Sequence, residues 1–238
     1  MSGRVVVVTG AARGVGREVA LGFAGRGDRL ALGDVDGEGV ERTARDVRAI
    51  GAEAMARAAD VSASAECDRL IEIAVSRWGS LDLLVNNAGV GLWGQAVELT
   101  DADWRRLIGV NLDGVVFCTR AALRVMLPRG RGQIITVCSD LGRVAAPNFA
   151  AYCASKFGVA GFTHAVAAEA RPHGVKVSLL YPGIIDTAFR RGQPNRPPET
   201  IPEPSRMLTA RDVAEAVIWM ASTGATAVAG EVVLDAAR

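Results

Sequence analysis

Two uncommon side chains meet in the segment "YCASK" at positions 152–156. The chain has only two tyrosines and two lysines, and Tyr152 and Lys156 lie four residues apart. On a helix this spacing places both side chains on one face. A phenol ordinarily ionises at about pH 10, and a neighbouring ammonium stabilises the phenolate and lowers its pKa. The pair therefore predicts a general acid or base that works near neutral pH, although a purely structural contact would show the same spacing.

Two further polar residues are candidates to join this pair. Ser139 ends an apolar run, "QIITVCS" at 133–139. In a parallel sheet that strand end shares a rim with the start of the next helix, so we expect the Ser139 hydroxyl beside Tyr152, where it could donate to a substrate oxygen. Asn111 lies in the apolar stripe of a predicted helix at 101–127, and a buried amide is costly unless its hydrogen bonds are satisfied. A turn serine and a structural polar contact are the alternative interpretations.

A glycine-rich turn near the start of the chain is suited to phosphate. In "VVVVTGAARGVG" a predicted strand runs into a predicted helix, and Gly10, Gly14 and Gly16 form a G-x-x-x-G-x-G pattern. Glycines let the backbone turn tightly and approach a diphosphate, and the helix N-terminus supplies unpaired N–H groups. The spacing differs from the usual G-x-G-x-x-G fingerprint, so an ordinary turn is the competing interpretation.

An acidic residue follows at the expected separation from these glycines. Asp34 ends the second predicted strand. A carboxylate there could accept hydrogen bonds from an adenosine ribose, and it would repel a 2′-phosphate. A helix N-cap in the sequence "DVDGEG" is the alternative role.

The elements that must position these residues alternate along the chain. Apolar runs predict strands at 4–9, 29–34, 52–58, 81–87, 133–139, 175–181 and 231–235, the third by position more than by composition. Segments of helical length lie between them, at 15–25, 37–50, 63–78, 101–127, 151–171 and 209–222. Continuous β-branched runs indicate strands buried on both faces. The alternation predicts an α/β fold in one domain over 1–238: a Rossmann-type, doubly wound sandwich with a seven-stranded parallel sheet and helices on both faces.

Composition narrows the class of protein. The net charge of +1 gives no indication of nucleic acid or a membrane as partner. The four cysteines show no C-x-x-C spacing, which favours reduced thiols and no metal site. No stretch is long enough to span a membrane, and we expect a cytoplasmic protein. The proline-rich segment 182–208 fits no predicted element and is typical of a lid or a disordered loop.

In combination, these motifs resemble the short-chain dehydrogenase/reductase family, in its single-domain branch. The likeness runs nearly end to end and rests on "TGAARGVG" (9–16), "DV" (60–61), "NNAG" (86–89), Asn111, Ser139, "YCASK" (152–156) and "PGIIDT" (182–187). It implies reversible hydride transfer between NAD or NADP and a secondary alcohol or ketone. It also implies a homodimer or homotetramer, associated through the helices at 101–127 and 151–171.

The resemblance implies a role for each matching residue. Tyr152 would carry the proton, while Lys156 would hold the nicotinamide ribose and tune the tyrosine. Ser139 would orient and polarise the substrate carbonyl, and Asn111 would anchor a water that links Lys156 to solvent. Cofactor contacts are implied for Gly10, Arg13, Gly14, Val15, Gly16, Asp34, Asp60, Val61, Asn87, Ala88, Gly89, Tyr152, Lys156, Pro182, Gly183, Ile185 and Thr187, with Asp60 and Val61 at the adenine and Ile185 and Thr187 at the carboxamide.

The choice of cofactor depends on two residues that point in opposite directions. Among relatives, an acid at the position of Asp34 goes with NAD. A basic residue at the position of Arg13 is frequent in NADP users. We expect NAD. The chain also departs from its relatives at the C-terminus, where "LDAAR" replaces a common Gly-Gly pair, which leaves the packing of this end open.

Two other functions share much of this pattern. A 3-oxoacyl-[acyl-carrier-protein] reductase would need a basic docking surface, which Arg124, Arg129 and Arg131 could supply. A non-catalytic nicotinamide-binding regulator could keep the glycine turn, but the intact set of reactive residues argues against it.

The substrate end is the least defined part. Trp93, Phe149, Phe189 and Met207 are expected near the rim of the site, where they indicate either an apolar substrate or lid packing. Arg190, Arg191 and Arg196 could meet an anionic substrate, although a solvated loop face is the preferred interpretation.

Overall fold

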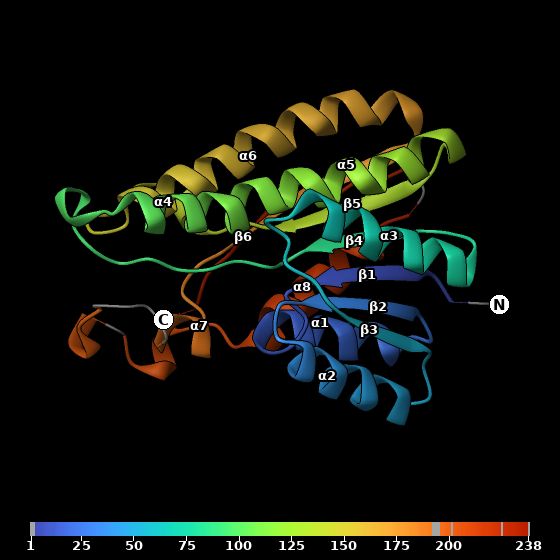
Figure 1. Ribbon diagram of the computed structural model, residues 1–238, viewed down its shortest axis with the longest axis horizontal. Helices are drawn as coiled ribbons and strands as arrows, with labels where there is room; N and C mark the ends of the chain where they lie inside the picture. The colour runs from blue at the N-terminus through green and yellow to red at the C-terminus, as the bar shows by residue number, and fades with distance from the viewer. Residues whose placement is uncertain (1–2, 192–195, 201, 225, 238) are drawn as a thin grey trace.

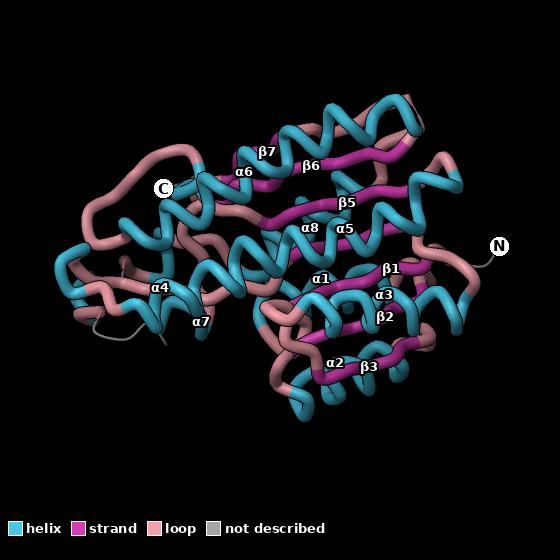
Figure 2. The backbone as a smooth tube through the Cα atoms, turned by 45° about the horizontal axis from the view of Figure 1, so that its top comes forward, coloured by secondary structure: helices cyan, strands magenta, loops and turns pink. Residues whose placement is uncertain are grey.

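One parallel sheet organises the chain. The structure, a computed structural model, describes residues 3–191, 196–200, 202–224 and 226–237. The strands are β1 (Val5–Thr9), β2 (Arg29–Asp34), β3 (Ala54–Ala58), β4 (Leu83–Asn86), β5 (Gly132–Val137), β6 (Val175–Pro182) and β7 (Glu231–Leu234), and they lie in the order β3-β2-β1-β4-β5-β6-β7 (Figure 2). This confirms the predicted seven-stranded Rossmann-type sheet, including the third strand.

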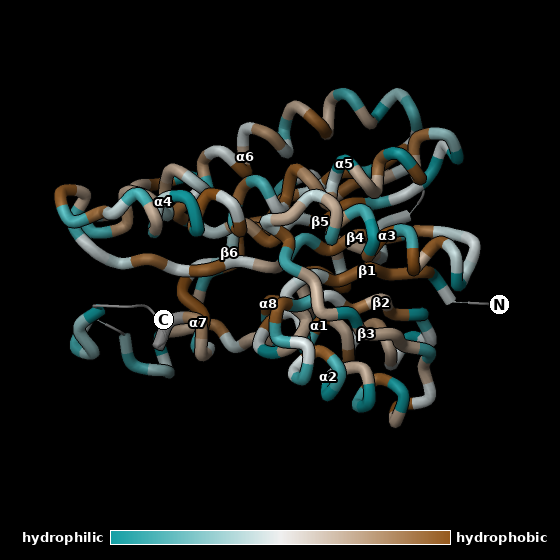
Figure 3. The backbone as a smooth tube through the Cα atoms, viewed as in Figure 1, coloured by the Kyte–Doolittle hydropathy of each residue, from teal (hydrophilic) through white to brown (hydrophobic). Residues whose placement is uncertain are grey.

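Helices cover both faces of this sheet. One face carries α1 (Gly14–Ala24), α2 (Gly37–Ala49) and α8 (Ala210–Ala221), and the other carries α3 (Ser64–Trp78), α4 (Asp101–Ile108), α5 (Gly114–Met126) and α6 (Ala150–Ala170) (Figure 1). A four-residue helix, α7 (Ala188–Arg191), follows β6. Successive residues of a strand point to opposite faces. Val6 and Val8 of β1 therefore pack in one core, and Val5 and Val7 in the other. The hydropathy of the chain follows this division, with apolar strands between helices whose outer faces are polar (Figure 3).

The predicted helix at 101–127 differs from a single α-helix. A π-helical turn, Gly109–Asp113, separates α4 from α5. The apolar spacing of the sequence continues across it, which is why the break was not expected. The turn contains Asn111, whose side chain bonds outside its own helix. Wide turns of this kind are frequent at functional sites.

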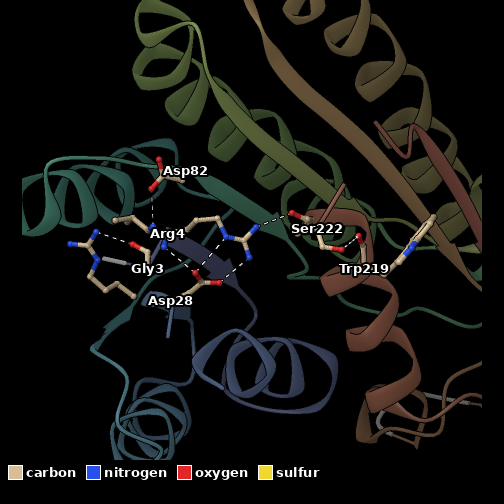
Figure 4. Close-up of polar contacts among 9 residues, drawn as sticks. Gly3, Arg4, Asp28, Asp82, Trp219 and Ser222 are labelled. Atoms are coloured by element: carbon tan, nitrogen blue, oxygen red, sulfur yellow. Dashed lines mark hydrogen bonds and ion pairs between the residues drawn. The ribbon is translucent and has the colours of Figure 1, made fainter. Parts of the chain in front are cut away.

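The rim at the amino ends of the strands is held by one arginine. The Arg4 guanidinium donates to Asp28 at 2.9 Å and to the carbonyl of Ala221 at 2.8 Å, while the Arg4 backbone N–H donates to Asp28 at 2.9 Å (Figure 4). Asp82 accepts from the N–H of Val5 at 2.9 Å. These contacts join the start of β1 to the start of β2, to the end of α8 and to the residue before β4.

The start of the segment 182–208 contacts both the end of that segment and the C-terminal strand β7. Leu208 bridges to Ile185, and Gly183 donates to the carbonyl of Leu234 at 2.8 Å. The segment was expected to hold no regular element, but it includes α7 and two 3-10 turns, at Pro198–Thr200 and Pro204–Arg206. Its role as a lid stays a prediction, and residues 192–195 and 201 lie outside the described chain.

A substitution at Gly16 should expose how tightly the glycine turn is packed. An added Cβ there would overlap the carbonyl oxygen of Gly10 and approach the Asn87 amide nitrogen to 2.6 Å. Overpacking of this kind costs about 1–3 kcal/mol, so Gly16→Ala should lower the free energy of unfolding by that amount in denaturant titration.

The other end of α1 offers a matched control. At Gly25 the backbone is right-handed helical, with φ −61°, and an added Cβ would meet only ordinary contacts at 3.7 Å. Gly25→Ala should therefore raise the free energy of unfolding by about 0.4–1 kcal/mol. Equal stability of the two variants would contradict the close approach at Gly16.

Candidate active site

A cleft of about 820 Å³ opens at the carboxyl ends of the strands. It lies where strand order reverses between β1 and β4, the usual ligand position in sheets of this type. Its volume falls in the range of cofactor and substrate pockets. The cleft is lined by Gly10, Arg13, Gly14, Val15, Asp34, Asp60, Val61, Asn87, Ala88, Gly89, Ser139, Tyr152, Lys156, Pro182, Gly183, Ile185 and Thr187. The structure thus brings together every predicted site residue except Gly16 and Asn111, which lie behind the wall.

The glycine turn is fastened to the end of β4. The Thr9 hydroxyl accepts from the N–H groups of Asn87 and Ala88, at 3.0 and 3.1 Å. The Asn87 side-chain amide donates to the carbonyls of Thr9 and Gly10, each at 3.0 Å. Gly10 and Gly14 have φ of 66° and 56°, a region that favours glycine. The bonds hold the turn open beside the N-terminus of α1, which suits a diphosphate.

Asp34 lies on the floor of the cleft, next to this turn. Its carboxylate accepts from the N–H of Ala12 at 2.9 Å and from the N–H of Asp36 at 3.0 Å. The N-cap of α2 is Asp36, which accepts from Gly39, so capping is not the role of Asp34. Each Asp34 oxygen keeps a lone pair for a ribose hydroxyl. Val35, the next residue, is 75% exposed and brings no basic charge to this place.

Tyr152 and Lys156 lie one turn apart on α6, at the opposite end of the cleft. The Lys156 ammonium is buried, 5.7 Å from the centroid of the Tyr152 ring and 3.4 Å from the carbonyl of Val137. Burial lowers the pKa of Lys156, because the ammonium loses its hydration, and the neighbouring Cys138 raises it by less. The ring of Tyr152 lies between Phe149 and Phe189, with centroids 6.4 and 6.3 Å away.

Asn111 is fully buried and connects three elements. Its side-chain oxygen accepts from the N–H of Val90 at 2.8 Å, and its nitrogen donates to the carbonyl of Val90 at 2.9 Å. The same nitrogen donates to the Ser155 hydroxyl at 3.2 Å, and that hydroxyl donates to the carbonyl of Tyr152 at 2.7 Å. Asn111 is therefore an anchor for the loop after β4 and for α6. Its implied role toward a water stays a prediction.

Ser139 lies beside the tyrosine's helix, but its hydroxyl is engaged. It donates to the Asp140 carboxylate at 2.8 Å and accepts from the N–H of Leu141 at 3.2 Å. Asp140 lines the cleft and was not singled out from the sequence. Ser155 was missed as well, although its place three residues after Tyr152 is typical of a helical serine that bonds back to a carbonyl.

The expected rim residues divide into two groups. Phe149, Phe189 and Arg196 line the cleft, whereas Trp93 and Met207 do not. The Arg196 guanidinium lies 5.4 Å from the centroid of the Phe149 ring, is partly buried and donates to Thr200 of its own loop, so it combines a cleft contact with a loop contact. The side chains of Arg190 and Arg191 lie outside the described part of the chain.

The described residues contain neither a metal-ligand cluster nor a membrane-spanning helix. No group of three or more His, Cys, Asp or Glu side chains is placed there to hold a metal ion. No described helix combines the length and the apolar character that a membrane crossing requires.

Known proteins resemble the chain over most of its length. A family model described as short chain dehydrogenase matches residues 4–197. A cis-4-hydroxycyclohexanecarboxylate dehydrogenase of Sinomonas cyclohexanicum is 38% identical, over 96% of this chain and 93% of that protein. A sorbitol dehydrogenase of Cereibacter sphaeroides is 36% identical, over 78% and 72%. The structure of an alcohol dehydrogenase of Thermococcus sibiricus, complexed with 5-hydroxy-NADP, superimposes with a TM-score of 0.88 at 28% identity, over 98% and 97%.

The buried charge of Lys156 makes a prediction about stability. Because its folded pKa lies below the unfolded value of 10.5, the ammonium disfavours folding at every pH below the folded pKa, and the penalty vanishes as the pH rises through 10.5. Lys156→Met should therefore raise the melting temperature at pH 7 by at least about 2 °C, the shift that roughly 1 kcal/mol produces in a chain of this size.

The second lysine is the control. Lys176 is only partly buried and donates to the carbonyls of Thr223 and Gly224. Lys176→Met should give no stabilisation at pH 7. The gain from Lys156→Met should shrink when both proteins are melted at pH 10, and a constant or absent gain would mean that burial does not penalise this ammonium.

Proposed function

Because the chain belongs to the short-chain dehydrogenase/reductase family and is an NAD(P)-dependent oxidoreductase of alcohols and ketones, we propose that it oxidises secondary alcohols with NAD, using Tyr152 as the proton carrier. The observation that carries this proposal is the placement of Tyr152, Lys156 and Ser139 around one end of a cleft whose other end holds the glycine turn. Acid–base chemistry and dinucleotide binding thus share one cavity.

The residues at the reactive end divide the work. A nicotinamide, when bound, takes up or gives back the hydride of the substrate carbon. Tyr152 takes the proton of the substrate hydroxyl in oxidation and returns it in reduction. The Lys156 ammonium, 5.7 Å from the ring, favours the phenolate form of Tyr152. Phe149 and Phe189 border the ring, and Tyr152 is only 9% exposed, which strengthens this electrostatic effect.

The preference for NAD is supported by the anchored carboxylate of Asp34. Its two backbone hydrogen bonds keep it at the adenosine end of the cleft. The opposing feature is Arg13, an exposed residue of the same wall that could pair with a 2′-phosphate. The NADP-type ligand of the Thermococcus sibiricus structure is a property of that relative. We favour NAD because no basic residue follows Asp34.

The proposal extends to assembly and location. Trp104 of α4 and Phe157 of α6 are 40% and 46% exposed, and burial of such side chains favours a homodimer or homotetramer through these helices. The four cysteines are free and buried, which suits the cytoplasm. Residues 1–238 are proposed to form one domain in which 182–208 cover the substrate.

The two alternatives have less support. Of the arginines expected to dock an acyl carrier, Arg124 pairs with Asp68 at 3.2 Å and Arg129 pairs with Asp82 at 3.6 Å, so two of the three positive charges already have an acidic partner. A non-catalytic regulator would have no need of a buried ammonium beside a tyrosine.

Removal of one phenol hydroxyl tests the proton carrier. Tyr152→Phe should reduce kcat by at least about a hundredfold, the usual contribution of a general acid or base, while NADH fluorescence titration shows binding within about threefold of wild type. Tyr181→Phe is the matched control: burial raises the pKa of Tyr181 to about 12, and this side chain is absent from the cleft. Its activity should stay within a few-fold of wild type. Full activity of Tyr152→Phe would refute the proposed role.

Cofactor preference can be tested at Asp34. A carboxylate about 5 Å from a phosphate dianion is repelled by on the order of 2 kcal/mol even in water, so kcat/KM should favour NAD over NADP by at least about tenfold. Asp34→Asn keeps an acceptor for one of the two N–H groups and removes the charge, and it should reduce the ratio by about tenfold. Arg13→Ala should move the ratio in the opposite direction. A wild type that uses NADP as well as NAD would show that Arg13 outweighs Asp34.

A further inference from the structure

We propose that Asp140 is a specificity-determining residue that accepts a hydrogen bond from a second hydroxyl group of the substrate, on the carbon next to the reacting one. The site would thus select vicinal diols and, in the reverse direction, α-hydroxy ketones. This inference rests on the proposed function, since it takes Ser139 and Tyr152 as the residues that face the reacting oxygen.

The first observation is how the Asp140 carboxylate is used. Asp140 follows Ser139, lines the cleft and is half-buried. Its Oδ1 atom accepts from the Ser139 hydroxyl and from the N–H of Leu141, each at 2.8 Å. Within the described residues, the Oδ2 atom accepts no hydrogen bond, and no cation lies at ion-pair distance from the carboxylate. The Asp140 carboxylate therefore uses only one of its two oxygens as a hydrogen-bond acceptor.

The second observation is the state of Ser139. A hydroxyl has one proton, and that of Ser139 points to Asp140. In this arrangement Ser139 cannot donate to the reacting oxygen of a substrate. A ketone oxygen only accepts hydrogen bonds. The Ser139 hydroxyl must therefore turn its proton away from Asp140 before it can polarise a substrate carbonyl.

A neighbouring substrate hydroxyl resolves this conflict. It can donate to Asp140 in place of Ser139, which frees the Ser139 proton for the reacting oxygen. Every donor then has an acceptor, and the carboxylate keeps its full set of bonds. The separation of 2.8 Å between Ser139 Oγ and Asp140 Oδ1 is close to that of two gauche hydroxyl oxygens on adjacent carbons. With a simple secondary alcohol, Asp140 Oδ1 keeps only the N–H of Leu141 once Ser139 turns away, and the loss of one donor at a partly buried carboxylate is unfavourable.

Charge and wall chemistry define the rest of the ligand. The ammonium of Lys156 and the guanidinium of Arg196 line the same end of the cleft, so a cationic donor such as an amino alcohol meets repulsion there. A neutral hydroxyl does not. Phe149, Phe189 and Leu141 supply apolar surface, which fits a hydrocarbon frame. The combination points to a small cyclic or branched vicinal diol.

A pair of substrates that differ by one hydroxyl tests the inference. With saturating NAD, wild type should oxidise cyclohexane-1,2-diol with a kcat/KM at least about tenfold above that of cyclohexanol. Asp140→Ala should bring this ratio near one, mainly through a higher KM for the diol. Asp140→Asn, which keeps an acceptor oxygen, should retain part of the preference and guards against a folding defect.

Controls separate the possible failures. Asp46→Ala removes an exposed carboxylate of α2 that pairs with Arg17, outside the cleft. It should change kcat/KM for neither alcohol. A wild-type ratio near one, or an equal loss on both alcohols in Asp140→Ala, overturns the inference and leaves the proposed function in place. If the wild-type protein binds NADH but produces no NADH from NAD and either alcohol, the proposed function fails, and the inference fails with it.

Discussion

The buried amide of Asn111 is the constraint on which the reactive end depends. A primary amide without exposure to water must find partners inside the protein, and here it finds the two backbone groups of Val90 and the Ser155 hydroxyl. These bonds set the distance between the strand-end loop and α6. The π turn that carries Asn111 lets its side chain reach sideways while α4 and α5 continue on either side.

The two ends of the cleft use different chemistry. The phosphate end consists of backbone groups: the glycine turn is held by Thr9 and by the Asn87 amide, and no ammonium or guanidinium is required to shape it. The reactive end consists of side chains in a low-dielectric wall, where the charge of Lys156 acts on its neighbours with little screening. The proposed selection of substrate adds a third group, the carboxylate of Asp140, which in the structure accepts from the Ser139 hydroxyl.

The fold and the cofactor end were predictable because local patterns determine them. Buried parallel strands give continuous apolar runs, and β3, which lacks one, could still be placed by the alternation of its neighbours. Tyr152 and Lys156 were found by their helical spacing. The π turn was not, since the apolar stripe from Leu107 to Val115 looks the same with or without a wide turn. Contacts such as Arg196 on Phe149 join distant segments, and no local pattern reports them.

The strand order has a consequence for how the protein is made. The lining of the cleft runs from Gly10 to Arg196, and its central strands, β1 and β4, are separated by more than seventy residues of chain. A nascent chain can therefore build β1, β2 and β3 early, but the pocket is complete only after the segment that follows β6 is in place. Ligand binding then stabilises the finished fold by mass action and offers nothing to any shorter folding intermediate. The cofactor concentration in the cell would thus raise the stability of the protein only after the chain has folded without it.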